Sequence, residues 1–229
     1  MDIEELTPEE LLGPLSEVEA RNAPRTLYLV GDRELLTKGA RVSIVGSRKA
    51  TPEGRGRAAR LARLLVERDI VVVSGLAEGI DTAAHTTAIE TGGRTVAVLG
   101  TPLDKCFPAK NRQLQERIGR DHLLVSQFAP ESGTGRKAFP MRNRTMALLS
   151  DATVIVEAGE SSGTLHQGYE ALRLGRPVFL MESVVSNESL TWPKEMMGYG
   201  AEVLSDQTVE MFFEMVPEGS RGERAQVAL

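Results

Sequence analysis

Apolar residues along this chain gather in short uninterrupted runs, separated by segments in which apolar positions recur at helical spacing. Runs of this kind, without alternating polar residues, are typical of strands that are buried on both faces of a parallel sheet. Four clear runs and two shorter ones occur, at Val42–Val45, Ile70–Val73, Val96–Leu99 and Val154–Val156, and at Leu123–Val125 and Val178–Leu180. The pattern predicts a strand at each of these places.

The segments between the runs carry the signals of helix ends. Residues 51–53 supply a threonine cap, a proline at the first helical position and an acidic first turn. The apolar residues of the next three turns fall on one face, which predicts a helix that starts at Pro52. Asp81 is expected to cap the next helix, Thr82–Glu90. Further helices are expected near Asn111–Ile118, Arg142–Leu149, Leu165–Leu174 and Thr208–Met215.

Strands and helices that alternate in this way predict an α/β fold. The expected architecture is a Rossmann-like, doubly wound, mostly parallel sheet with helices on both faces. We expect residues 1–25 to form an acidic helical lead-in, residues 26–216 to form the domain, and residues 217–229 to be a disordered tail. Ligands of such sheets bind at the carboxyl ends of the strands, so the loops that follow the strands are the candidate sites.

Composition places the chain among ordinary globular proteins, with 41% hydrophobic and 26% charged residues in 229. It has no apolar run of about 18 residues, so no membrane span is expected. The first 20 residues hold seven acidic residues and neither Lys nor Arg, which is unlike a signal peptide. The lone Cys106 excludes an internal disulfide and a cysteine-rich zinc site. A cytoplasmic protein is the simplest interpretation.

The net charge of −5 hides two locally basic segments. Residues 41–63 hold seven cations against the single acid Glu53, and residues 136–144 hold four cations and no acid. These cations are Arg41, Arg48, Lys49, Arg55, Arg57, Arg60 and Arg63, and Arg136, Lys137, Arg142 and Arg144. A continuous basic face formed by both segments would bind a nucleic acid. The alternative for the arginines of residues 55–63 is a solvated helix face.

The loop after the first run combines a glycine, two cations and a helix start. It reads Gly46, Ser47, Arg48, Lys49 and lacks the glycine spacing of a dinucleotide-binding loop, and no segment of the chain has the P-loop pattern. A phosphate site is the hypothesis that remains. After the second run, Gly75 would permit close approach of the backbone to a ligand.

Two later segments open helices and supply further phosphate contacts. Lys137, Arg142, Asn143 and Arg144 precede the fourth run, and two arginines two positions apart face different directions, so that one can pair inward while the other meets a phosphate. Ser162, Gly163 and Thr164 follow the fourth run and offer hydroxyls and backbone N–H groups as an anion cradle. Asp81 and His85 we assign to structure.

Taken in order, these segments resemble one protein family. The motifs are Val42-Ser43-Ile44-Val45-Gly46-Ser47-Arg48, Ser74-Gly75-Leu76-Ala77-x-Gly79-Ile80-Asp81-x-x-Ala84-His85, Val96-Ala97-Val98-Leu99-Gly100, Phe139-Pro140-x-Arg142-Asn143-Arg144 and Ser162-Gly163-Thr164. They resemble the DprA/Smf family of DNA-processing proteins over roughly residues 24–181, and Leu27-Tyr28-x-x-Gly31 resembles the entrance to that family's core.

The resemblance implies a non-catalytic protein that binds single-stranded DNA, forms a homodimer and helps to load a RecA-type recombinase in natural transformation and DNA recombination. It implies a positively charged site, no cofactor and no metal. The residues carried over to the site are Gly46, Ser47, Arg48, Lys49, Gly75, Lys137, Arg142, Asn143, Arg144, Ser162, Gly163 and Thr164. Arg48 and Arg144 are the expected phosphate anchors. Aromatic residues in these loops are few, Phe107, Phe128 and Phe139, so binding dominated by phosphates is expected, with Phe139 equally suited to the core.

The chain departs from the family pattern in several places. At 229 residues we expect neither the helical domain nor the winged-helix domain that family members often carry, and Gln127 stands where a glutamate is expected. The related LOG phosphoribohydrolases are the main alternative, but Gln167 occupies the position of their catalytic glutamate, and an amide cannot act as acid or base. A third alternative is a nucleotide sensor that uses His166, Gln167 and Tyr169.

Overall fold

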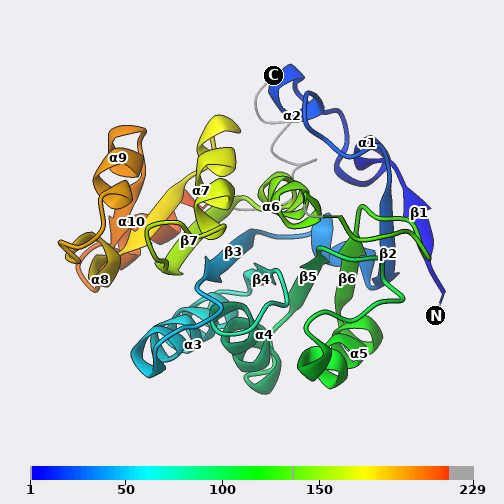
Figure 1. Ribbon diagram of the computed structural model, residues 1–229, viewed down its shortest axis with the longest axis horizontal. Helices are drawn as coiled ribbons and strands as arrows, with labels where there is room; N and C mark the ends of the chain where they lie inside the picture. The colour runs from blue at the N-terminus through cyan, green and yellow to red at the C-terminus, as the bar shows by residue number, and fades with distance from the viewer. Residues whose placement is uncertain (1, 136, 217–229) are drawn as a thin grey trace.

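The computed structural model describes residues 2–135 and 137–216. Its strands form one sheet in the order β1-β2-β6-β5-β4-β3-β7-β8-β9 (Figure 1). The strands are β1 (Glu4–Leu6), β2 (Leu27–Gly31), β3 (Arg41–Gly46), β4 (Val71–Ser74), β5 (Thr95–Leu99), β6 (Leu123–Ser126), β7 (Ala152–Glu157), β8 (Val178–Met181) and β9 (Glu202–Leu204). All neighbours from β6 to β9 pair in parallel, whereas β2 pairs antiparallel with β6 and β1 antiparallel with β2.

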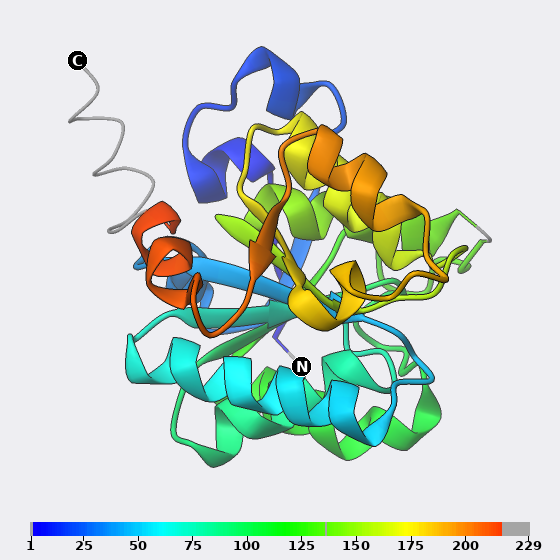
Figure 2. The same ribbon diagram turned by 90° about the vertical axis from the view of Figure 1, so that its left-hand side faces the viewer.

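Helices cover both faces of this sheet, as Figure 2 shows edge on. Helices α3, α4 and α5 lie on one face, and α6, α7 and α9 lie on the other. The helices are α1 (Pro8–Leu12), α2 (Glu17–Ala20), α3 (Pro52–Glu67), α4 (Ile80–Glu90), α5 (Arg112–Asp121), α6 (Ala138–Leu149), α7 (Thr164–Arg173), α8 (Glu182–Val185), α9 (Trp192–Gly198) and α10 (Val209–Met215), with short 3-10 helices at Arg33–Leu36 and Ala109–Asn111. The predicted doubly wound α/β fold is confirmed.

Burial on both faces explains why the strands read as uninterrupted apolar runs. In β3, Val42 and Ile44 pack in the cluster that includes Leu61 of α3, while Val45 packs in the opposite cluster with Met146 of α6. All six predicted runs are strands of the sheet. The predicted cap of α3 is also present, because the Thr51 side chain accepts a hydrogen bond from the Gly54 N–H at 2.9 Å.

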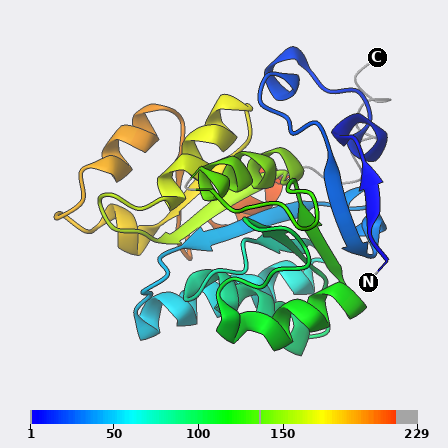
Figure 3. The same cartoon turned by 45° about the vertical axis from the view of Figure 1, so that its right-hand side comes forward.

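The N-terminal segment contributes more than the expected helices. Residues 1–25 contain α1 and α2, but also the edge strand β1, which lies beside β2 at the end of the sheet away from α8 and α9 (Figure 3). The capping role expected of Asp81 is wrong, since Gly79 caps α4 and Asp81 lies inside the helix. The tail predicted at residues 217–229 lies outside the described residues.

The order of the strands creates one switch point. From β3 the chain proceeds outward through β4, β5 and β6 on one side, and then returns to place β7 on the other side of β3. The connections that leave β3 and β7 therefore run in opposite directions, which opens a crevice at the carboxyl ends of these two strands. None of the helices in the described part of the chain is long and apolar enough to cross a membrane.

Candidate nucleic-acid interface

A cavity of about 450 Å³ occupies the crevice at the switch point. Its walls come from the loop after β3, the loop after β7 and the first turns of α6 and α7. The sequence-predicted residues among those that line it are Gly46, Ser47, Arg48, Lys49, Arg142, Asn143, Ser162, Gly163 and Thr164. Three segments that are far apart in the sequence thus meet in one place.

The other three predicted residues lie elsewhere. Gly75 lines an adjoining cavity of about 250 Å³, which shares Arg48, Lys49 and Arg142 with the first. Lys137 and Arg144 are exposed and stand outside the lining of both cavities. Arg144 was an expected phosphate anchor, and its position on α6 leaves Arg48 and Lys49 as the exposed cations at the cavity wall.

The first residues of the loop after β3 are held by hydrogen bonds to β7, to α7 and within the loop. Its first residue, Ser47, donates its N–H to the Glu157 carbonyl at 2.6 Å, next to a shift of register between β3 and β7. The Ser47 hydroxyl accepts the Lys49 N–H at 3.1 Å, which tightens the turn. Thr164, at the start of α7, donates its hydroxyl to the Gly46 carbonyl at 3.1 Å. The loop therefore presents Arg48 and Lys49 from a fixed backbone.

Two phenylalanines give the site an aromatic surface. The Arg48 guanidinium lies over the Phe139 ring, 4.8 Å from its centroid, and the Phe107 ring lies 5.5 Å from the Phe139 ring. Phe107 is 52% exposed, and both rings line the smaller cavity. Phe139 is half-buried, so it is a wall of the site as well as a packing residue. Both residues were named from the sequence, but their contact was not predicted, because Phe107 lies in a loop and Phe139 lies in the first turn of α6, about 30 positions later.

Arg142 lies at the floor of both cavities with 5% of its surface exposed. Its Nη1 donates to the Val98 carbonyl at 3.2 Å and lies 4.0 Å from the Asp81 carboxylate. This is the inward arginine of the predicted pair. Burial lowers the pKa of Arg142 and raises the pKa of Asp81, and the attraction between the two charges opposes both changes.

Gly75 leaves the space that the buried Arg142 side chain occupies. A Cβ at Gly75 would collide with the Arg142 guanidinium, so the absence of a side chain makes room for Arg142 rather than for a ligand. Asp81 accepts the N–H groups of Gly75 and Ala77 at 3.1 and 3.3 Å, which fixes the same loop from below. The structural role predicted for Asp81 thus takes the form of a brace within the loop after β4.

The cradle after β7 is tied to α6. Asn143 is buried and donates its side-chain amide to the Gly163 carbonyl at 3.0 Å. The Ser162 hydroxyl accepts the Thr164 N–H at 3.2 Å, at the first turn of α7. Gly159 and Ser161 also line the cavity, and their place directly after a predicted strand was the signal that could have found them. His166 of α7, which the nucleotide-sensor alternative names, lines it as well. The start of α7 therefore faces the cavity, where its N–H groups favour an anion.

Gln167 lines the same cavity but is buried, with 1% of its surface exposed. It lies within hydrogen-bond distance of the Thr153 hydroxyl at 3.4 Å. His85, beneath the site on α4, is also buried, and its Nδ1 lies 2.7 Å from the Thr95 hydroxyl. Burial lowers the pKa of His85 to about 3, so this imidazole is neutral at physiological pH. Among the described residues, no three His, Cys, Asp or Glu side chains gather as a metal site requires.

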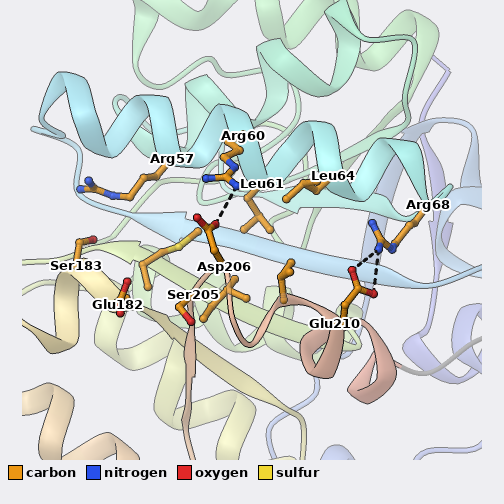
Figure 4. Close-up of a pocket in the computed structure, with 13 residues that line it drawn as sticks. Arg57, Arg60, Leu61, Leu64, Arg68, Glu182, Ser183, Ser205, Asp206 and Glu210 are labelled. Atoms are coloured by element: carbon orange, nitrogen blue, oxygen red, sulfur yellow. Dashed lines mark hydrogen bonds and ion pairs between the residues drawn. The ribbon is translucent and has the colours of Figure 1, made fainter.

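The arginines of α3 do not line the main cavity, which favours the alternative of a helix face apart from the site over one continuous basic face. Arg57, Arg60 and Arg68 instead line a separate cavity of about 330 Å³ between α3 and α10 (Figure 4). Arg60 pairs with Asp206 at 2.9 Å, and Arg68 pairs with Glu210 at 3.1 Å. Asp206 lies in the loop after β9 and Glu210 lies in α10, and the sequence alone does not predict that these acids lie opposite α3.

Arg41 is the other cation of residues 41–63 that the structure removes from the basic face. It is 1% exposed and forms a buried ion pair with Asp151, with N–O distances of 2.9 to 3.0 Å. Its guanidinium also donates to the Leu36 carbonyl. This pair joins the start of β3 to the segment before β7, so Arg41 stabilises the sheet and is not available to a ligand.

Comparison with known proteins gives the same result as the motifs. The family model described as "DNA recombination-mediator protein A" matches residues 8–216. The chain belongs to this family. It is 34% identical over 195 residues to the DNA processing protein DprA of Bacillus subtilis, covering 85% of this chain and 65% of that protein. It is 42% identical over 161 residues to DprA of Streptococcus pneumoniae, covering 70% and 56%. The matches thus span 56% to 65% of the length of these curated relatives.

Solved DprA structures share the fold. The structure of DprA from Streptococcus pneumoniae superposes with a TM-score of 0.77 at 32% identity, covering 91% of this chain and 74% of that one. A structure that describes the single-stranded DNA binding mode of DprA from Helicobacter pylori gives a TM-score of 0.78 at 25% identity, covering 93% and 98%. A molybdenum cofactor binding protein from Rippkaea orientalis, at a TM-score of 0.57 and 20% identity, shares the fold alone.

Proposed function

We propose that this DprA family member binds single-stranded DNA, without catalysis, in the crevice at the β3–β7 switch point. The observation that carries the proposal is the meeting of Arg48 and Lys49, the start of α7 and the Phe107–Phe139 pair around connected cavities. Single-strand binders combine a positively charged groove with aromatic surfaces on which bases stack. The binding of single-stranded DNA described for the Helicobacter pylori relative supports the same ligand here.

Each part of the proposed interface has a separate task. Arg48 and Lys49 neutralise a phosphate, and the Ser162 hydroxyl and the Gly163 N–H receive the same or the next phosphate. The Thr164 hydroxyl and N–H are engaged with the Gly46 carbonyl and the Ser162 hydroxyl. The exposed face of Phe107 offers a surface for a base. Contacts of these kinds read no base edges, so the binding should tolerate any sequence and weaken as salt rises.

A hydrolytic role of the LOG type finds no support at the corresponding position. Gln167 is buried at the cavity wall and has no carboxylate with which to transfer a proton. A nucleotide sensor remains a second candidate, because a cavity of about 450 Å³ is large enough for a small ligand. Competition by a nucleoside monophosphate against bound DNA tests it directly.

We also propose, from the resemblance and the family, that the protein acts as a homodimer and assists a RecA-type recombinase. A dimer would have twice the 24.9 kDa mass of the chain in sedimentation velocity at micromolar concentration. A recombinase contact would appear as faster formation of recombinase filaments on DNA that this protein has coated.

The experiment that tests the proposed ligand is fluorescence anisotropy of a labelled oligothymidine, titrated with protein at several salt concentrations. Saturable binding with a steep salt dependence is expected. No binding at low salt would contradict the proposal. Displacement of the DNA by nucleoside monophosphate at micromolar concentration would instead favour the nucleotide sensor.

Arg48→Ala is expected to weaken the affinity for oligothymidine by about 1–3 kcal/mol, or roughly 5- to 150-fold, because a charge-assisted phosphate contact is lost. The slope of log affinity against log salt concentration should also become shallower by about 0.7, which is the contribution of one phosphate contact on a single strand. Arg63→Ala is the matched control, since Arg63 is an exposed arginine of α3 outside the lining of the described cavities. Equal effects of the two substitutions on affinity would contradict the assignment of Arg48 to the interface.

A further inference from the structure

We propose that Glu157 is the positioning residue of the DNA site and that its carboxylate sets the shape of the loop that carries Arg48 and Lys49. The inference rests on the proposed function of that loop. Glu157 is the last residue of β7, and its side chain is 20% exposed. It does not line the main cavity, so its role would be exerted through the loop and not through the ligand.

Glu157 holds both ends of the loop at once. Its backbone carbonyl accepts the Ser47 N–H at 2.6 Å, and its carboxylate accepts the Thr51 N–H at 2.9 Å and the Thr51 hydroxyl at 2.5 Å. Between these two anchors lie Arg48, Lys49 and one further residue. A loop this short, fixed at each end by the same residue, has few alternative conformations, so its two cations are presented in a defined place.

The N-terminal turn of α3 is built to admit this carboxylate. A Cβ at Gly54 would collide with the Glu157 carboxylate, so glycine is required there if the contact with Thr51 is to form. Thr51 also caps α3 through its hydroxyl, which ties the carboxylate to the start of the helix. A negative charge near the first turn of a helix is itself favourable.

The negative charge of Glu157 allows a positioning role to be distinguished from a purely electrostatic one. A carboxylate beside a phosphate site repels DNA, so a residue that acted only through its charge would tighten binding when it is removed. Arg57 lies 3.7 Å from the carboxylate and offsets part of that repulsion. A positioning role predicts the opposite sign for removal of the whole side chain, because the loop loses its anchor although the local charge becomes more positive.

The test measures oligothymidine affinity by anisotropy for four single variants. Glu157→Ala should weaken binding by about tenfold or more, whereas Glu157→Gln should stay within about threefold of wild type, because its amide can still accept the Thr51 N–H. Gly54→Ala displaces the carboxylate without removing it and should weaken binding as Glu157→Ala does. Gly56→Ala, on the same helix with no atom within 4 Å of its new Cβ, should leave the affinity unchanged.

Two results would overturn the inference. One is Glu157→Ala binding as tightly as wild type, or more tightly, in a folded protein. The other is Glu157→Gln binding as weakly as Glu157→Ala. Thermal unfolding of each variant checks folding, and Gly54→Ala guards against a folding defect because alanine favours the helix over glycine.

A measurement without DNA separates this inference from the proposed function. Amide hydrogen exchange at Thr51 reports the bond to the carboxylate directly, and it should accelerate in Glu157→Ala and Gly54→Ala but not in Gly56→Ala. Unchanged exchange at Thr51 would contradict the positioning role even if the wild type bound no oligothymidine. Absence of DNA binding with accelerated exchange would contradict the proposed function alone and leave the positioning of the loop supported.

Discussion

Gly75 and Arg142 are in contact at the floor of the site, and this contact leaves no space for a side chain at position 75. The guanidinium lies where a Cβ at Gly75 would stand, and it is surrounded by the Val98 carbonyl and the Asp81 carboxylate. Displacing a buried charge from such partners is costly.

Gly75→Ala is therefore expected to lower the free energy of unfolding by about 1–3 kcal/mol, the usual cost of forcing an extra group into a packed interior. Gly163→Ala is the control, because no atom lies within 4 Å of its new Cβ and its φ of −60° suits any residue. That substitution should be neutral or slightly stabilising. Urea denaturation checks both, and equal stability of the two variants would show that Arg142 yields without cost.

His85 is expected to make stability depend on pH. Its pKa of about 3 in the folded protein lies below the ordinary value near 6.5, so the unfolded chain binds the proton more readily. The stabilisation is complete above pH 6.5 and is lost as the pH falls toward 3, by up to about 1.4 kcal/mol per pH unit. Urea denaturation between pH 7 and 4 should show a shallower decline for His85→Asn than for wild type. His166→Asn, at an exposed histidine, should keep the full decline.

At the scale of elements, α3 contacts two separate regions with different parts of its length. Its N-terminal turn, through Thr51 and Gly54, contacts the Glu157 carboxylate beside the loop of the proposed DNA site. Its later turns present Arg60 and Arg68 to the acids near α10 (Figure 4). Arg57 lies between these regions, because it lines the cavity between α3 and α10 and also contacts Glu157.

The double variant Arg60→Ala/Arg63→Ala is expected to keep its affinity for oligothymidine within about twofold and to lose less than about 1 kcal/mol of stability, since exposed ion pairs contribute little. Arg57 is left intact because its loss would disturb Glu157. Anisotropy and thermal unfolding check the two expectations. A loss of affinity as large as that of Arg48→Ala would show that the DNA follows α3.

The sequence predicted the parts of this architecture that depend on local pattern. Strands buried on both faces appear in the sequence as apolar runs, and the cap at Thr51 is indicated by the residues of a four-residue segment. The edge strand β1 reads Glu4-Glu5-Leu6 and has no such apolar run, because two of its three side chains are exposed. Capping by Asp81 failed as a prediction since its carboxylate turns back to the loop at Gly75.

The site was predicted as a set of loops but not as a geometry. Topology brings the ends of β3 and β7 together, and that step follows from the order of the strands, which periodicity alone does not give. The contact of Glu157 with Thr51 spans 106 positions, and that of Arg41 with Asp151 spans 110. Pairings at such distances depend on the tertiary fold, so the inward turn of Arg142 and the anchoring of the loop emerge only in three dimensions.

At the scale of the whole molecule, charge is separated. The chain carries a net charge of −5, yet the exposed cations Arg48 and Lys49 lie at the switch point. Asp206 and Glu210 lie in the separate cavity between α3 and α10. The proposed DNA ligand would therefore be attracted by Arg48 and Lys49 at short range and repelled by the net charge of the protein at long range. Because salt screens the distant charges first, affinity for oligothymidine is expected to fall less steeply between very low and moderate salt than between moderate and high salt. Anisotropy over this range checks it, and a uniform slope would contradict it.

The two outermost strands of the sheet limit how copies of this chain can associate. β1 and β9 are three residues long, and each has an exposed glutamate at its start. A second chain that extended the sheet at either edge would gain a ladder of only a few hydrogen bonds, and charged side chains oppose such growth. Self-assembly by backbone pairing is thus disfavoured at both ends. A dimer of this protein would be held by side chains from its helical layers, so its strength should follow surface substitutions there and be indifferent to the edges.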